Sequence, residues 1–139
     1  MADITLTGVY VTDTNATYVS GIAGTTIAAG QLVYFESSSR TYKLANAASS
    51  TGTANVVGVA LNGAVANQPV KILTKGILIN GAATLTAGLT YDLSGVTSGA
   101  IAPDADLVAA STWNNTFVGI GLSTTQLLVS PVISNTVNA

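Results

Sequence analysis

The feature that most constrains this chain is a short phrase of residues that occurs twice. Residues 28–36 read AAGQLVYFE, and residues 86–94 read TAGLTYDLS. The glycines of the two phrases, Gly30 and Gly88, are 58 positions apart. Self-similarity at a fixed spacing is typical of duplicated structural units. We therefore expect the two copies to form the same local structure.

The likeness extends beyond the phrase itself. Each copy is followed by an apolar stop, a polar stretch and a glycine-containing apolar run, VVGVAL in the first copy and FVGIGL in the second. Val57 and Val118 in these runs are 61 positions apart, so the spacing is kept apart from a small insertion. We predict two similar units over about residues 26–75 and 84–130.

Strand signals dominate both units and predict an all-β fold. Short runs rich in Val, Ile, Leu and aromatic residues, such as LVYFE, VKIL and LLV, alternate with Gly, Asn, Ser and Pro clusters. No long stretch has the apolar spacing of a helix, although residues 105–110 could form a short helical turn. At 139 residues the chain suits one domain. We expect a small β-barrel body over residues 21–133 and a flexible polar tail over 134–139.

Two glycines interrupt the apolar runs at matching places. Gly58 and Gly119 each lie inside a predicted strand, where glycine usually marks a bulge, a bend or the close approach of another backbone. The run NVVGVALN has few polar positions on either face. That pattern indicates a strand covered on both sides.

The segment 1–20 lies outside the two units and alternates apolar and polar residues from Ile4 to Val11. Two interpretations are open. The arm is the first strand of the chain's own sheet, or it adds to the edge of a neighbouring protein, where main-chain hydrogen bonds give affinity.

The composition excludes several classes of partner and site. Only 7% of the residues are charged and the net charge is −2, so no cationic face for nucleic acid is expected. Cysteine is absent, which removes disulfides and thiolate metal sites. The apolar runs are too short to cross a bilayer, and the start of the chain lacks the pattern of a secretory signal. We expect no cofactor, no metal, no membrane and no nucleic acid.

The sequence offers few candidate catalytic residues. The chain has no histidine, so the Ser-His-Asp and Cys-His arrangements are excluded. The closest carboxylate pair is Asp104 and Asp106 in APDAD, where Pro-Asp is first of all a turn or helix-cap signal. Glu36 and Asp92 follow the tyrosines of the two phrases, which suggests one shared position at a strand end. We predict that the protein is not an enzyme.

Trp113 lies in the polar stretch ASTWNNTF before an apolar run. A tryptophan there can stack on a sugar or anchor a protein interface, or it can fold back over the core. We favour a contact with the core, another copy or a partner.

The order AGxxVY, TYKLANA, VVGVAL, VKIL, TAGLTYDLS and VGIGLS over about residues 22–132 resembles the capsid decoration, or cement, proteins of tailed bacteriophages. Their compact β-barrel-like body is often called a β-tulip. The resemblance implies a virion protein on the outer capsid surface, assembled in the bacterial cytoplasm. It would bind the major capsid protein as a homotrimer and clamp neighbouring capsid subunits.

The resemblance also implies that the N-terminal arm orders on the shell by adding a strand to a capsid loop. On this hypothesis the arm could be deleted without unfolding the body. The arm residues expected to contact the capsid are Ala2, Asp3, Ile4, Thr5, Leu6, Thr7, Val9 and Val11.

Two other classes of function share parts of this pattern. A head fibre, spike or tail adhesin domain that binds a host glycan or receptor would have the same uncharged all-β character, together with an exposed aromatic cluster. A glycan hydrolase would need a carboxylate pair in a cleft, for which APDAD is the only candidate.

Overall fold

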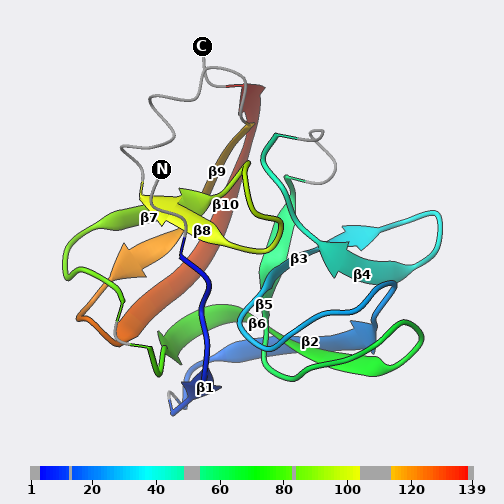
Figure 1. The fold of residues 1–139 in the computed structure, drawn as a ribbon, viewed down its shortest axis with the longest axis horizontal. Coiled ribbons are helices and arrows are strands. Elements are labelled where there is room, and N and C mark those ends of the chain that lie inside the picture. Colours follow the sequence, from blue (N-terminus) through cyan, green and yellow to red (C-terminus); the bar gives the residue numbers. More distant parts are fainter. Residues whose placement is uncertain (1–3, 13, 49–53, 83, 104–113, 138–139) are drawn as a thin grey trace.

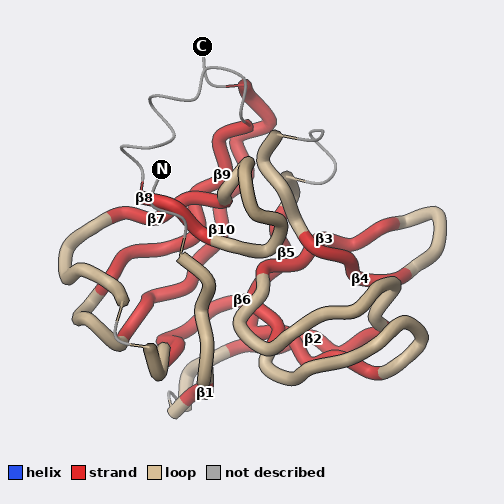
Figure 2. The backbone as a smooth tube through the Cα atoms, viewed as in Figure 1, coloured by secondary structure: helices blue, strands red, loops and turns tan. Residues whose placement is uncertain are grey.

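The fold is all-β, as the sequence predicted. The computed structural model describes residues 4–12, 14–48, 54–82, 84–103 and 114–137, and within these ranges it contains strands and no helix. A single antiparallel sheet curls into a half-barrel (Figures 1 and 2). Its strands are β1 (Tyr10–Val11), β2 (Thr17–Ile22), β3 (Leu32–Glu36), β4 (Thr41–Leu44), β5 (Val56–Ala60), β6 (Pro69–Ile79), β7 (Thr90–Leu93), β8 (Ile101–Pro103), β9 (Asn114–Gly121) and β10 (Gln126–Val137).

The sheet consists of two halves with the same connectivity. The strand order is β4-β3-β5-β6-β10-β9-β7-β8, and β2 also pairs with β6. Half A, residues 17–75, therefore reads β4-β3-β5-β6-β2. Strand β6 belongs to both halves, since it pairs with β2 over residues 69–75 and with β10 over 76–79. Half B, residues 76–137, therefore reads β8-β7-β9-β10 and then the second part of β6. The predicted duplication is confirmed.

The repeated phrase forms the same turn in both halves. The Gln31 amide donates to the Ala28 carbonyl at 3.2 Å, and in half B the Leu89 amide donates to the Thr86 carbonyl at 3.2 Å. The third residue of each turn is a glycine with positive φ, +96° at Gly30 and +81° at Gly88. These are the features of a type II turn, which requires a residue that adopts positive φ easily.

The two interior glycines also have the same role. Each lies beside a β-bulge, between the pairs Val33–Gly58 and Tyr34–Val56 in half A, and again between β7 and β9 at Gly119. A Cβ at either glycine would collide with a backbone carbonyl of the next strand, that of Leu73 or Leu128. Close backbone approach therefore requires glycine at both places, as predicted.

The structure corrects the extent and register of the repeat. The first unit begins at β2 and not near residue 26. In half A, β2 pairs with the first part of β6, just as the second part of β6 pairs with β10 in half B. Strand pairing aligns Tyr34 with Asp92, and Val33 with Tyr91, at the same 58-residue spacing as Gly30 and Gly88, so the two phrase tyrosines are not equivalent. Glu36 accordingly has no acidic counterpart in half B.

The halves curl toward opposite sides of the sheet. Leu73 and Leu78 lie five positions apart on β6, yet both face the same cluster, because a bulge at Thr74 shifts the alternation of the strand. As a result, the side of half A that faces away from its own inner cluster packs on the interior of half B. We call this side of each half its outer wall. Half A encloses its own inner cluster of Ala23, Ile27, Val33, Ala60, Ala64, Val70 and Ile72.

The N-terminal arm closes half B. Ile4 forms a bridge with Ile101 of β8, with N–O distances of 2.8 and 3.0 Å, and β1 pairs with the end of β6. Leu6, between these two attachments, is fully buried in the core. Half A closes itself at the matching place, through a bridge between Ala23 and Tyr42 of β4. Of the two interpretations of the arm, the structure supports the strand of the chain's own sheet.

The C-terminal strand is longer than expected. β10 runs to Val137, where it pairs with Asn114 of β9, so residues 134–137 of the predicted flexible tail belong to a strand. The pair extends beyond the rest of the sheet at the top of Figure 1.

Candidate interaction surface

The arm residues expected at a capsid divide into two groups. Ile4, Leu6, Val9 and Val11 pack on the core, whereas Thr5 and Thr7 are exposed. Ala2 and Asp3 lie outside the described residues.

Asn80 fastens the arm to the end of β6. Its Oδ1 accepts from the Thr7 amide at 3.2 Å, and the Thr7 carbonyl accepts from the Gly81 amide at 2.9 Å. Asn80 is fully buried, and its Nδ2 donates to the hydroxyl of Thr84 at 3.0 Å. The expectation that the arm could be deleted without unfolding the body is not supported by this packing.

The acidic residues do not form a catalytic pair within the described ranges. Asp104, Asp106 and Trp113 all fall outside them. Glu36 lies at the exposed end of the β3–β4 hairpin, whereas Asp92 is buried in β7, so they do not share a position. No three metal-ligating side chains gather in the described part of the chain, and no helix there is long and apolar enough to cross a membrane.

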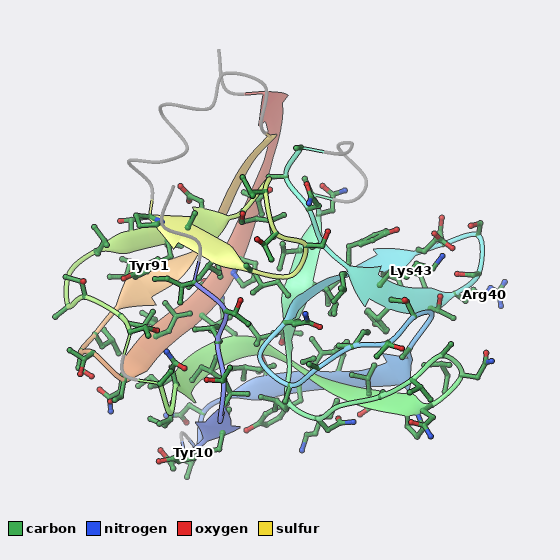
Figure 3. The ribbon with its side chains drawn as sticks, viewed as in Figure 1. Tyr10, Arg40, Lys43 and Tyr91 are labelled. Carbon is green, nitrogen blue, oxygen red and sulfur yellow. The ribbon has the colours of Figure 1, made fainter. Side chains whose placement is uncertain are left out.

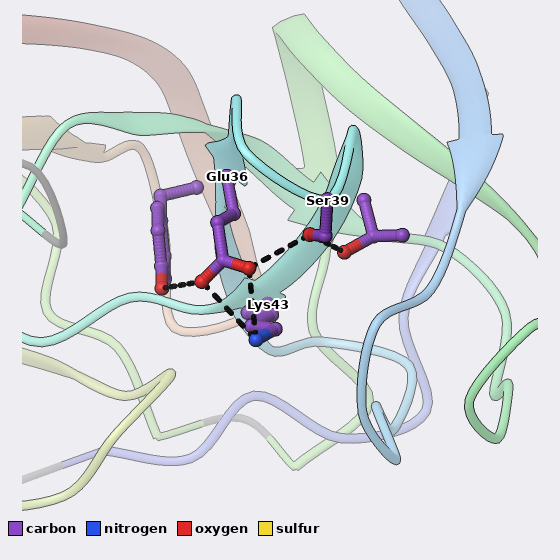
Figure 4. Close-up of polar contacts among 5 residues, drawn as sticks. Glu36, Ser39 and Lys43 are labelled. Carbon is purple, nitrogen blue, oxygen red and sulfur yellow. Dashed lines mark hydrogen bonds and ion pairs between the residues drawn. The ribbon is translucent and has the colours of Figure 1, made fainter.

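Glu36 is the centre of a small polar cluster (Figure 4). Its carboxylate accepts from Ser39 Oγ at 2.7 Å and from Tyr34 OH at 3.4 Å, and it pairs with Lys43 Nζ at 3.0 Å. Ser39, then Lys43 and Tyr34, lower the pKa of the Glu36 carboxyl below 4.5, although partial burial opposes the shift. Every partner belongs to the same hairpin, so the cluster holds the hairpin together.

The informative difference between the halves lies on their outer walls. In half A one row of directly paired residues crosses the sheet from β6 through β5 to β3, and it consists of Leu73, Val59 and Leu32. All three are 0% exposed and belong to the core cluster that they share with the interior of half B. Half B is therefore the cover of this row.

No part of the chain that the structure describes covers the same row in half B. It consists of Leu128, Ile120 and Thr90, which occupy the positions of Leu73, Val59 and Leu32. Leu128 is 39% exposed and Ile120 is 36% exposed.

Further apolar residues extend this row into a surface. Ile77 pairs with Leu128, Tyr10 pairs with Ile79 two residues along β6, and exposed Leu122 directly follows β9. We call this surface the β10 face; its members are Tyr10, Ile77, Ile79, Ile120, Leu122 and Leu128. None of them is charged. Contiguous exposed apolar surface on a sheet is typical of an interaction site.

A second exposed surface lies on half A. Tyr18 and Ile22 point outward from β2, and Ile22 pairs with exposed Pro69. Lys71 Nζ lies 4.4 Å from the centre of the Tyr18 ring, a cation–π contact that leaves a positive charge at the surface. We call these four residues the β2 face. Tyr10 marks the edge of the β10 face in Figure 3, and the β3–β4 hairpin with Arg40 and Lys43 lies at the opposite end of the molecule.

Sequence reasoning missed the β10 face. The run NVVGVALN was interpreted as covered on both sides, and this is correct for β5 because Val59 and Ala60 are both buried. The equivalent run of β9 was not interpreted in this way, and its Ile120 is exposed. The apolar runs of β5 and β9 have the same sequence pattern, and their different burial results from the packing of the two halves.

Comparison of the sequence with protein-family models finds no match, and neither does comparison with curated proteins.

Proposed function

We propose that the chain is a non-enzymatic structural protein that binds the outer surface of a bacteriophage capsid as a homotrimer and stabilises contacts between major capsid subunits. The observation that carries the proposal is the presence of two exposed apolar faces on different halves of one continuous sheet. The resemblance of the repeat units to cement proteins supplies the capsid as the partner.

Two faces on one body suit a protein that joins other proteins. A cement protein has to contact the shell and also hold its neighbours, so one surface is insufficient. On a repeated lattice, each contact is made at high effective concentration once the first has formed, and modest affinity per contact is enough. The β2 face, which carries Lys71, is the one that we assign to the capsid.

The arm has a reduced part in this proposal. Since Ile4, Leu6, Val9 and Val11 pack on the body, Thr5 and Thr7 are the exposed ones among the described residues that were expected to contact the capsid. Contact through these residues would position the protein on the shell without a change in the fold.

The first experiment is the copy number of the chain in purified, DNA-filled particles, measured by quantitative mass spectrometry against the major capsid protein. A ratio that fits the capsid lattice supports the proposal. A few copies per particle would favour a spike or tail adhesin, and absence from the particle would overturn the virion assignment.

A matched pair of variants tests the β2 face. Ile22→Glu places a charge on that face, and Val96→Glu places one at a 63% exposed position in half B, outside both faces. We expect Ile22→Glu to weaken binding to purified heads by at least about tenfold and Val96→Glu to leave it unchanged. Equal binding by both variants would exclude the β2 face as the capsid contact.

The alternative function, an adhesin domain, is favoured by one observation. Phe35 is 45% exposed and the centre of its ring lies 5.2 Å from that of Tyr42, and exposed aromatic rings can stack on sugars. Glycan-array binding that is lost in Phe35→Ala, with low copy number in the particle, would support this alternative over capsid cement.

A further inference from the structure

We infer that the pair Asn62 and Gly63 is a site of self-modification, at which the folded chain loses the side-chain amide of Asn62 through a succinimide. The inference does not depend on the proposed function. The dipeptide Asn-Gly occurs twice, at residues 62–63 and 80–81. Its asparagine is reactive because glycine has no Cβ to obstruct the attack of its nitrogen on the preceding side chain. The surroundings of the two pairs decide which of them reacts in the folded state.

The reaction needs only groups of the chain and water. The Gly63 nitrogen attacks Asn62 Cγ and forms a new N–Cγ bond, while the proton of the Gly63 amide passes to solvent. The bond between Cγ and Nδ2 then breaks with release of ammonia. Water opens the succinimide ring at either carbonyl and leaves aspartate or isoaspartate at position 62, with one additional negative charge in both cases.

Asn62 and Gly63 meet the requirements of this reaction in the folded state. Gly63 is exposed in the loop between β5 and β6, and its amide donates to no described residue, so solvent can remove its proton. Asn62 Oδ1 accepts from the Lys71 amide at 2.8 Å, and this is the oxygen on which negative charge develops during the attack. Nδ2 donates to the carbonyls of Gly63 and Pro69 at 3.1 and 3.2 Å, but these exposed bonds exchange with water at small cost in free energy.

The fold prevents the same reaction at Asn80 and Gly81. The Gly81 amide donates to the Thr7 carbonyl of the arm at 2.9 Å, so the attacking nitrogen is engaged. Asn80 is fully buried, with Oδ1 accepting from the amides of Thr7 and Ala82 at 3.2 and 3.3 Å and Nδ2 donating to Thr84 Oγ1 at 3.0 Å. Asn80 can therefore react only while the arm is detached, which lowers its rate by the fraction of time that the arm spends in that state.

The product changes the edge of the β2 face. Asn62 joins its loop to the start of β6 through Pro69 and Lys71, and both of these residues belong to that face. Once Nδ2 is lost, a carboxylate faces the Pro69 carbonyl in place of a donor. The modification therefore adds a negative charge beside the face and releases the loop from Pro69.

The test is the time course of amide loss in the folded chain at mildly alkaline pH, with peptide mass spectrometry to resolve positions 62 and 80. The same time course in guanidinium chloride gives the rate of each pair without the fold. We expect the folded chain, after division by these unfolded rates, to react at Asn62 at least about tenfold faster than at Asn80. Equal normalised rates, or an unmodified Asn62 after a time in which the unfolded chain reacts completely, overturns the inference.

Gly63→Ala is the matched variant for the chemical route. Gly63 does not have positive φ, and its Cβ would meet only the Ile27 carbonyl at 3.7 Å, so the variant keeps the fold while the added Cβ obstructs the attack. We expect Gly63→Ala to lose the Asn62 amide at least about tenfold more slowly than the unmodified chain, with the rate at Asn80 unchanged. An equal rate at Asn62 in the folded variant would mean direct hydrolysis of the side chain and would contradict the succinimide.

Discussion

Halves A and B share a backbone plan and differ in what surrounds it. Both begin their first hairpin after a type II turn, both carry a bulge next to an obligatory glycine, and both arrange their strands in the same order. Half A closes on itself and has its outer row covered. Half B needs the N-terminal arm to close, and its outer row is exposed.

The difference teaches that a duplicated unit does not have duplicated surroundings. When one unit packs its outer wall on the interior of the next, the last unit in the series is left with an open wall. Half B also inserts its hairpin loop against half A, where the Gly99 carbonyl accepts from the Leu32 amide at 2.9 Å, whereas the corresponding hairpin of half A ends in the exposed cluster around Glu36. The following predictions test which properties belong to the unit and which to its position.

The largest effect is expected at the glycines that the halves share. Gly58→Ala and Gly119→Ala each place a Cβ against a backbone carbonyl of the neighbouring strand, and that carbonyl cannot move without opening the sheet. We expect each variant to lose at least about 4 kcal/mol of unfolding free energy in urea denaturation. Gly63→Ala is the control, because its Cβ would meet only the Ile27 carbonyl at 3.7 Å. A tolerated change at one glycine and not the other would show that the bulges are not equivalent.

We expect the N-terminal arm to be essential for the stability of half B. Leu6→Ala removes a fully buried side chain from the core, and we expect a loss of about 2–5 kcal/mol in the free energy of unfolding. The adjacent exposed residue supplies the control, since Thr5→Ala should change stability by no more than about 0.5 kcal/mol. Unfolding of Leu6→Ala at the same urea concentration as Thr5→Ala would restore the hypothesis of a detachable arm.

The equivalent leucines of the two outer rows should respond differently. Leu73→Ala leaves a cavity between the halves and is expected to cost about 2–5 kcal/mol. Leu128→Ala, at the same position of half B, should cost no more than about 1 kcal/mol, because Leu128 is already 39% exposed. Equal losses measured by urea denaturation at low protein concentration would mean that the β10 face is covered within the chain.

The repeated turn allows a finer comparison. Gly30→Ala suffers from positive φ and from a collision with the Leu6 carbonyl of the arm, whereas Gly88→Ala suffers from positive φ alone, with nothing within 4 Å of its Cβ. We expect Gly88→Ala to cost about 1 kcal/mol and Gly30→Ala at least about 2 kcal/mol by thermal or urea unfolding. A larger loss for Gly88→Ala would contradict the contact between the arm and the first turn.

Local sequence signals were sufficient for the all-β class, the duplication and the roles of the glycines, because residue type, alternation and spacing carry these signals. The register of the repeat was misjudged, since the tyrosines of the phrases were aligned by residue type, although the 58-residue spacing of Gly30 and Gly88 places Tyr34 at the position of Asp92.

The β10 face could not be predicted from these signals. Val59 and Ile120 are apolar residues in equivalent runs, and one is buried while the other is exposed. Their burial depends on the direction in which each half curls. That direction is set at Thr74, where an extra residue on β6 changes which face Leu78 presents to the core.

The smallest expected effect concerns the ends of the two hairpins. In half A the end is held by Glu36, whose pKa is lowered first by Ser39 and then by Lys43, whereas the aligned residue of half B, Ser94, accepts from the amides of Val96 and Thr97 through an uncharged hydroxyl. Because a lowered carboxyl pKa stabilises the folded state above the unfolded value of 4.5, this contribution is lost as the pH falls through the folded pKa.

Acidification from pH 7 to 3 should therefore loosen the hairpin of half A and leave that of half B unchanged. NMR titration is expected to show the amides of Ser39 and Thr41 shifting with the Glu36 carboxyl, with no matching shift at Val96 and Thr97. Ser39→Ala should move the Glu36 pKa back toward 4.5, since the Ser39 hydroxyl is the largest cause of its lowering. A titration shared by both hairpins would mean that the two ends are coupled through the sheet, and an unchanged Glu36 pKa in Ser39→Ala would assign the shift to Lys43 instead.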